Sequence, residues 1–223
     1  MQSIITWRNL FNMEQLLQSA DFLCIVNQHR RNKGYTAELS NLPTVYTEDS
    51  SDAIFDIIDC KQGESIIQQQ GNGTAHYFNS QQDPIRNMRF IAYENFINHL
   101  PNDYNNGWSR ADYIAYDTSE GKSYFIIHEL SEGKLNNKRS KGLIQLQNTL
   151  MRLRECKSIE KFMDSFQNRW CILSATEGAQ QAPLDMTAGF NNIYREIPDP
   201  KPLKATIITN RGFTAWETIN VKL

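Results

Sequence analysis

The sequence lacks the marks of a secreted, zinc-finger or membrane protein. Its four cysteines, at positions 24, 60, 156 and 171, form no C-x-x-C pair and have no histidine cluster beside them. This pattern argues against a zinc site or a disulfide framework. No apolar run approaches the roughly 18 residues of a membrane span. The opening residues, MQSIITWRNLF, lack the apolar centre of a signal peptide. We therefore expect a soluble cytoplasmic protein that does not bind membranes.

An excess of one charge is also lacking. The formal net charge is −2 over 223 residues, so there is no global attraction to nucleic acid or membrane. Several catalytic motifs are missing as well: G-x-S-x-G, H-E-x-x-H and a G-x-G-x-x-G after a strand. The stretch YDTSEGKS ends like a phosphate-binding loop, but Tyr116 stands where the first glycine belongs. These absences exclude the common nucleophilic, zinc-protease and dinucleotide chemistries.

The hydrophobic content of 40% is enough for a proper core. We expect one compact unit, in which residues 1–82 form a helical or irregular N-terminal extension and residues 83–223 form the core. Cap residues, proline positions and hydrophobic periodicity predict the elements. In the extension they predict a helix over 12–24 capped by Asn12, a short strand over 43–47, a short helix over 50–60 and an irregular segment over 66–82.

The core is predicted as a helix, two strands, a helix and two further strands. The first helix runs over 83–101, with Asp83 as its cap, Pro84 at its first position and Pro101 just past its end. The strands RADYIAYDT and KSYFIIHELS form a hairpin. The remaining elements are a helix over 137–156, whose apolar stripe is Leu143, Leu146, Leu150 and Leu153, and strands over 169–175 and 204–210.

The hairpin predicts a pair of facing carboxylates. If Glu120-Gly121 is a two-residue type I′ turn, glycine supplies the positive φ that its second position needs. Asp112 then lies opposite Glu129, and Ile114 lies opposite Ile127 on the same face. Opposed side chains have Cβ atoms roughly 4.5–5.5 Å apart. Two carboxylates so close repel unless a cation such as Mg²⁺ or Mn²⁺ lies between them.

The hairpin acids also have simpler interpretations. Glu129 could be a strand-end acid in water or a partner of Arg110, and Asp112 could simply begin a strand. A register slip of one residue would put the two acids on opposite faces of the sheet. His128 points away from Glu129 in the predicted register, which favours a hydrogen-bonded histidine of the core or of an interface over a metal ligand.

This arrangement resembles the PD-(D/E)xK, or restriction-endonuclease-like, nuclease superfamily. The resemblance rests on Asp112 in RADYIAYD, Glu129 in FIIHELS and the following helix KRSKGLIQLQNTL, and it covers about residues 84–175. It implies an α/β fold with a mixed central sheet flanked by helices in an αβββαβ core. It also implies hydrolysis of phosphodiester bonds with Mg²⁺ or Mn²⁺, held by Asp112, Glu129 and the backbone carbonyl of Leu130. DNA is a more natural substrate than RNA, and a homodimer is a possible assembly. Glu94 and Glu38 are candidates for the additional carboxylates that some members use.

The family's catalytic lysine is replaced by Ser131, which cannot supply the charge that offsets the transition state. Lys138, Lys141 and Gln145, spaced i, i+3 and i+7, share one face of the next helix and are candidate catalytic replacements. Lys134, in the connecting loop, is another. If none reaches the site, the alternative is an inactive nuclease fold that binds nucleic acid or protein.

The stretch between Gly133 and Arg154 contains six basic residues and no acid. A basic face of this kind can follow a phosphate backbone, although taken by itself the pattern is more typical of an ordinary solvated helix face. The predicted nucleic-acid contacts are Lys134, Lys138, Arg139, Lys141 and Arg152.

Overall fold

The computed structural model describes residues 12–59, 65–71, 73–79, 85–101, 104, 109–177 and 199–223, and the side chains of these residues except 132–138 and 175–177. The helices are α1 (Met13–Leu17), α2 (Ala20–Asn32), α3 (Tyr93–Asn98), α5 (Leu135–Glu155), α6 (Lys157–Asp164) and α8 (Thr206–Thr209). The strands are β1 (Thr47–Ser50), β2 (Ile54–Ile57), β3 (Ile67–Gln68), β4 (Ala75–Phe78), β5 (Met88–Ala92), β6 (Tyr113–Asp117), β7 (Tyr124–Lys134), β8 (Asn168–Glu177), β9 (Lys201–Pro202), β10 (Thr214–Glu217) and β11 (Asn220–Lys222).

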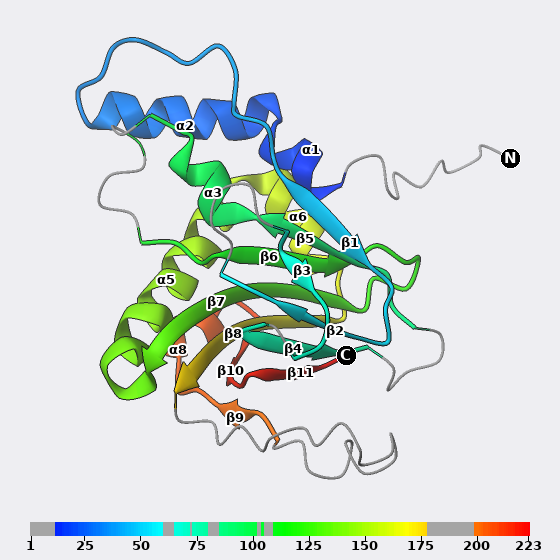
Figure 1. Ribbon diagram of the computed structural model, residues 1–223. Coiled ribbons are helices and arrows are strands. Elements are labelled where there is room, and N and C mark those ends of the chain that lie inside the picture. The colour runs from blue at the N-terminus through cyan, green and yellow to red at the C-terminus, as the bar shows by residue number, and fades with distance from the viewer. Residues whose placement is uncertain are drawn as a thin grey trace, which may run out of the picture.

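The strands form two sheets (Figure 1). The central sheet has seven strands in the order β1-β5-β6-β7-β8-β10-β9. Neighbours from β1 to β7 are antiparallel, whereas β7, β8 and β10 run parallel. The second sheet has four strands in the order β11-β4-β2-β3. The fold is therefore α/β with a mixed central sheet flanked by helices, as the sequence predicts.

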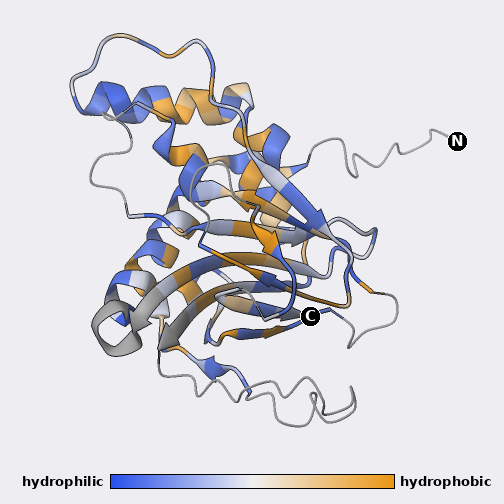
Figure 2. Ribbon diagram, in the orientation of Figure 1, coloured by the Kyte–Doolittle hydropathy of each residue, from blue (hydrophilic) through white to orange (hydrophobic). Residues whose placement is uncertain are grey.

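The two faces of the central sheet have different covers. Alternate residues of a strand point to opposite faces, and β7 shows the result. Phe125 and Ile127 pack in one cluster with residues of the helices. Ile126 and Leu130 pack in another, with residues of the second sheet such as Tyr77. Figure 2 shows apolar residues in the helices and in the strands of both sheets. The second sheet as a covering layer is not predicted by the sequence.

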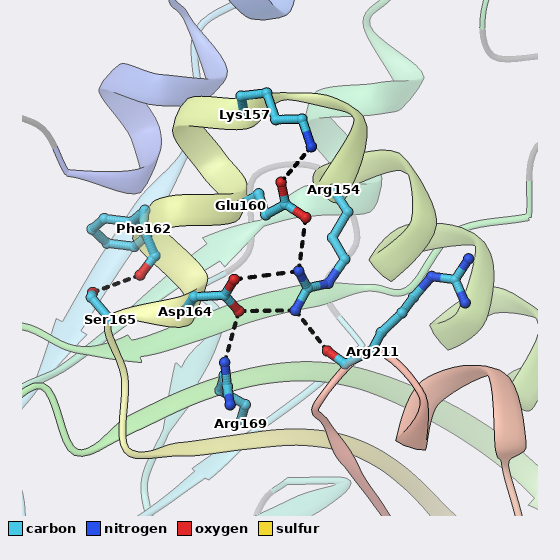
Figure 3. Close-up of polar contacts among 8 residues, drawn as sticks. All are labelled: Arg154, Lys157, Glu160, Phe162, Asp164, Ser165, Arg169 and Arg211. Atoms are coloured by element: carbon cyan, nitrogen blue, oxygen red, sulfur yellow. Dashed lines mark hydrogen bonds and ion pairs between the residues drawn. The ribbon is translucent and has the colours of Figure 1, made fainter.

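Helix α5 connects β7 to the parallel strand β8 and packs on the central sheet. The predicted leucine stripe is confirmed, because Leu146, Leu150 and Leu153 are fully buried and Leu143 packs against the same cluster. Arg154 anchors the end of the helix (Figure 3).

The guanidinium of Arg154 lies 3.0 Å from Glu160 Oε1 and 2.9 Å from Asp164 Oδ1, and it donates to the Arg211 carbonyl at 2.6 Å. Arg169 of β8 joins the same Asp164 at 2.7 Å. These contacts tie α5 to α6, β8 and the segment after α8, and so fix the direction in which its other end approaches the sheet.

Several predicted elements are confirmed in place. Strands β6 and β7, helix α5 and strand β8 lie where the sequence predicts two strands, a helix and a strand. The helix predicted over 12–24 is two helices. Asn12 caps the first in a capping box, and the Ser19 side chain accepts from the Phe22 amide to cap the second.

Other predictions are wrong. The helix predicted over 83–101 is strand β5 followed by the short helix α3, while Asp83 and Pro84 lie outside the described residues. In β5, Met88 and Phe90 pack toward the second sheet and Ile91 toward the helices. Contacts on both faces therefore favour a strand, whereas the local cap and proline signals favour a helix.

The N-terminal extension is not merely helical or irregular. The predicted helix over 50–60 contains strand β2, and the predicted irregular segment over 66–82 contains β3 and β4. The strand predicted over 43–47 lies over 47–50, as β1, and joins the central sheet. The strand predicted over 204–210 is helix α8, with β10 after it. Long-range pairing decides these elements, and local sequence does not report it.

The predicted hairpin turn is also wrong in type. Lys122, at φ 42°, carries the positive φ, and Gly121 does not. The Asp117 side chain organises a longer connection by accepting from the Ser119 amide at 2.9 Å and from the Ser123 amide at 3.0 Å. The strands nevertheless pair in the predicted register.

Candidate functional site

The β6–β7 register brings Asp112 and Glu129 together. Ile114 pairs with Ile127 and Tyr113 pairs with His128, so one further step along the two chains sets Asp112 opposite Glu129. Both acids then share the face of Ile114 and Ile127, which is the face covered by helices. The Leu130 amide donates to Asp112 Oδ2 at 2.6 Å, which holds the carboxylate against the end of β7. The predicted register is confirmed.

The two carboxylates are buried. Asp112 is 7% exposed and Glu129 is 5% exposed. Glu129 Oε2 has no hydrogen-bond partner among the described residues. Arg110, the alternative partner for Glu129, instead has its Nε 3.7 Å from Glu94 Oε1. Glu129 is therefore neither a solvated strand-end acid nor the ion-pair partner of Arg110.

Burial is the main cause that raises the pKa of Glu129 far above its ordinary value, and the negative charges of Asp112 and Glu94 raise it further. Burial also raises the pKa of Asp112, against the opposing effect of the Leu130 amide. Without a cation, the two groups thus resist being ionised together. This is the electrostatic situation that a bound divalent cation would relieve.

Among the described side chains of α5, Lys141 is the cation that acts on this pair. It lowers the pKa of Asp112, of Glu129 and of Glu94, and it is exposed. The next residue lets the helix come close: a Cβ on Gly142 would lie 2.6 Å from Leu173 Cδ1 and 3.5 Å from Glu129 Cγ. Glycine at 142 therefore permits the close packing of α5 against Leu173 and Glu129.

Gln145 also faces this region, but its amide is engaged with the backbone. Its Nε2 donates to the Arg110 carbonyl at 2.9 Å, and the side chain is 8% exposed. The predicted shared face of Lys141 and Gln145 is therefore present. This bond occupies the amide nitrogen of Gln145, and a direct catalytic part for Gln145 stays a prediction.

The other basic residues predicted to contact nucleic acid differ in burial and in ion pairing. The side chains of Lys134 and Lys138 lie outside the described part of the chain. Arg139 is exposed, and its Nε lies 3.0 Å from Glu217 Oε2. Arg152 is wrong as a nucleic-acid contact, because it is 5% exposed and its Nη1 lies 2.9 Å from Glu155 Oε2. A side chain buried in this way cannot follow a phosphate backbone.

Two further acids lie near the site. The Glu94 amide, in the first turn of α3, donates to the Asp112 carbonyl at 3.1 Å. The charge of Asp59, just after β2, raises the pKa of Asp112, Glu129 and Glu94. The sequence does not indicate this position of Asp59, because its local pattern predicts a separate helix over 50–60. Glu38, the other candidate, instead forms an ion pair with Arg31.

In the described ranges, no group of three or more His, Cys, Asp or Glu side chains is arranged to hold a metal ion. A cation at Asp112 and Glu129 would need oxygen ligands from the backbone, water or substrate, which is the usual condition of Mg²⁺ in proteins. The N–H and C=O of one strand residue point toward the same neighbouring strand. The Leu130 carbonyl is thus directed to the same side as its amide, toward Asp112.

His128 lies on the other face, as predicted. Its Nδ1 is 2.8 Å from the Tyr77 hydroxyl and its Nε2 is 2.7 Å from Ser174 Oγ. Complete burial lowers its pKa to about 3, so the ring is neutral. It is a hydrogen-bonded core histidine between the two sheets.

Comparisons of the chain with protein-family models, curated protein sequences and solved structures found no match. None of the helices in the described ranges is long and apolar enough to cross a membrane.

Proposed function

We propose that the protein is a metal-dependent nuclease of the PD-(D/E)xK type, which hydrolyses phosphodiester bonds of DNA or RNA. The observation that carries the proposal is the pair of buried carboxylates, Asp112 and Glu129, on one face of the hairpin. The order of elements supports it: the antiparallel strands β5, β6 and β7 are followed by α5 and by β8 parallel to β7. This is the strand-helix-strand order that the resemblance implies.

The site fits Mg²⁺ or Mn²⁺ because its donors are hard oxygens and Glu129 Oε2 has no protein partner among the described residues. Asp112, Glu129 and the Leu130 carbonyl would hold the ion. When bound, it would lower the pKa of a water and neutralise charge on the phosphate. Lys141 takes the part of the missing family lysine, because its ammonium can offset negative charge that develops beside the two carboxylates.

The alternative is an inactive nuclease fold that binds nucleic acid or protein. It is favoured by Ser131, which is 7% exposed and puts a neutral hydroxyl in β7 where the family has a lysine. The active nuclease remains the favoured proposal because Lys141 is exposed and flexible. Its side chain can reach the carboxylates once substrate is present, since catalytic contacts often form only in the complex.

Cleavage assays test the proposal. The wild-type protein is expected to cut single- or double-stranded DNA or RNA in Mg²⁺ or Mn²⁺ and to stop when EDTA is added. Salt-dependent binding without cleavage would support the inactive fold. If neither cleavage nor binding is found on any of these substrates, a nucleic-acid function is wrong.

Reversing Lys138 and Lys141 to Glu is expected to weaken binding and to flatten its salt dependence. Each lost phosphate contact removes about 0.9 from the slope of log K against log salt for duplex DNA. Two lost contacts should thus reduce the slope by about 1.8. Fluorescence anisotropy at several salt concentrations measures this change.

The matched control reverses Lys157 and Lys161 of α6, which changes the net charge equally at another helix. It should leave the slope within about 0.3 of wild type. Equal effects of the two double variants would mean that overall charge, and not the face of α5, governs binding.

A further inference from the structure

Helix α5 holds the backbone that leads into Asp112 at two successive residues. Gln145 Nε2 donates to the Arg110 carbonyl at 2.9 Å, and Thr149 Oγ1 accepts from the Ala111 amide at 2.8 Å. Gln145 and Thr149 are one helical turn apart, so they lie on the same side of the helix. Thr149 is 1% exposed and Ala111 is fully buried. The Thr149–Ala111 bond is thus shielded from water, and the Gln145–Arg110 bond is partly buried.

Strand pairing alone does not fix Asp112. The ladder between β6 and β7 ends at Tyr113 and His128, so residues 110–112 lie beyond it. Their position depends on α3, through the amide of Glu94, and on the two bonds from α5. The same helix also reaches the other carboxylate, because Gly142 abuts the Glu129 side chain.

We propose that Gln145 and Thr149 are positioning residues that set the Asp112 carboxylate against the Leu130 amide and opposite Glu129. Through Gly142, Gln145 and Thr149, one helix fixes the separation of the two acids. As far as it concerns a metal ion, this inference rests on the proposed function. The placement of Asp112 itself does not.

The test uses Gln145→Met and Thr149→Val, which keep size and remove the two bonds. Thr149→Ser keeps the hydroxyl, and Gln147→Met makes the same change at a half-buried glutamine of α5. The first readout is amide hydrogen exchange at Leu130 in the metal-free protein, because the 2.6 Å bond to Asp112 protects it. Ile126, in the middle of β7, is the internal reference. The second readout is Mn²⁺ affinity by titration calorimetry.

In the Gln145→Met/Thr149→Val double variant, exchange at Leu130 should accelerate about tenfold or more relative to Ile126. Mn²⁺ affinity should fall by about 10–100-fold, as is usual when the partners of metal ligands are removed. Thr149→Ser and Gln147→Met should stay within about twofold of wild type in both measurements.

The outcomes separate the two proposals. If Leu130 responds but the wild type binds no Mn²⁺, the positioning role stands and the metal site is wrong. If exchange at Leu130 is unchanged, the positioning role is wrong whatever the metal result. If Leu130 and Ile126 accelerate equally, the two side chains only stabilise the fold, and the inference is likewise overturned.

Discussion

Glu129→Gln is expected to abolish metal-dependent cleavage and to raise the stability of the metal-free protein. Gln keeps the shape of Glu but cannot supply the negative charge that holds a cation. A bound metal contributes several kcal/mol of charge stabilisation, so cleavage should fall about 10³-fold or more. Without metal, the variant no longer places a second ionisable carboxyl beside Asp112, and the repulsion between the two acids disappears.

The gain in stability should depend on pH in a definite direction. In the folded chain the pKa of Glu129 is raised above the ordinary value of 4.5 by burial and by Asp112. At a pH above 4.5 but below the folded pKa, Glu129 has lost its proton in the unfolded chain and still binds it in the folded chain. The contribution of Glu129 to stability is therefore present at low pH and is lost progressively as pH rises toward the folded pKa.

Thermal unfolding in EDTA from pH 5 to 9 measures this effect. The melting temperature of the wild type should fall, relative to that of Glu129→Gln, as pH rises, and Mn²⁺ should restore it only in the wild type. Glu120→Gln, at the exposed hairpin turn, is the matched control and should behave as wild type. A structural, ion-paired Glu129 would give the opposite result: neutralising it would lower stability, by about 3–5 kcal/mol for a buried pair.

Lys141→Met is expected to reduce kcat/KM for cleavage by about 10²–10³-fold, because it removes the positive charge that we propose offsets charge on the reacting phosphate while keeping the aliphatic stem. Ser131→Lys alone should change little, since Lys141 already supplies that charge. In the Ser131→Lys/Lys141→Met double variant, the family lysine takes over and a substantial part of the activity should return.

The double variant is informative because the effects of Ser131→Lys and Lys141→Met on activity are non-additive only if residues 131 and 141 act in the same site. Lys157→Met, an exposed lysine of α6, controls for the loss of a surface charge. Full activity in Lys141→Met would contradict the assignment of Lys141. Weak cleavage created by Ser131→Lys in an otherwise inactive wild type would identify the protein as an inactive nuclease fold.

The sequence predicts the pairing of Asp112 with Glu129, because that pairing depends on two strands that are neighbours along the chain. In the observed pairing Ile114 and Ile127 both face the helices, and a shift of one residue would put the two strands' residues of this pair on opposite faces of the sheet. The register held even though Lys122, and not Gly121, carries the positive φ of the turn. The leucine spacing of α5 similarly fixes which side of that helix faces the sheet.

The rest depends on contacts between distant parts of the chain. Strand β4 pairs with β11, about 140 residues later, and no local signal reports that pairing. Asp59 reaches the neighbourhood of Glu129 only because β2 belongs to a sheet stacked on the central one. Arg152 shows that charge alone does not predict exposure. A charged residue is expected at the surface, but Arg152 lies three residues after Thr149, on the side of α5 that faces inward.

Anomalous diffraction from an Mn²⁺-soaked crystal locates the metal ion independently of activity. We expect one strong peak between the carboxylates of Asp112 and Glu129, with oxygen ligands at about 2.1 Å that include the Leu130 carbonyl. A peak elsewhere, no peak at saturating Mn²⁺, or the two side chains on opposite faces of the sheet would contradict it.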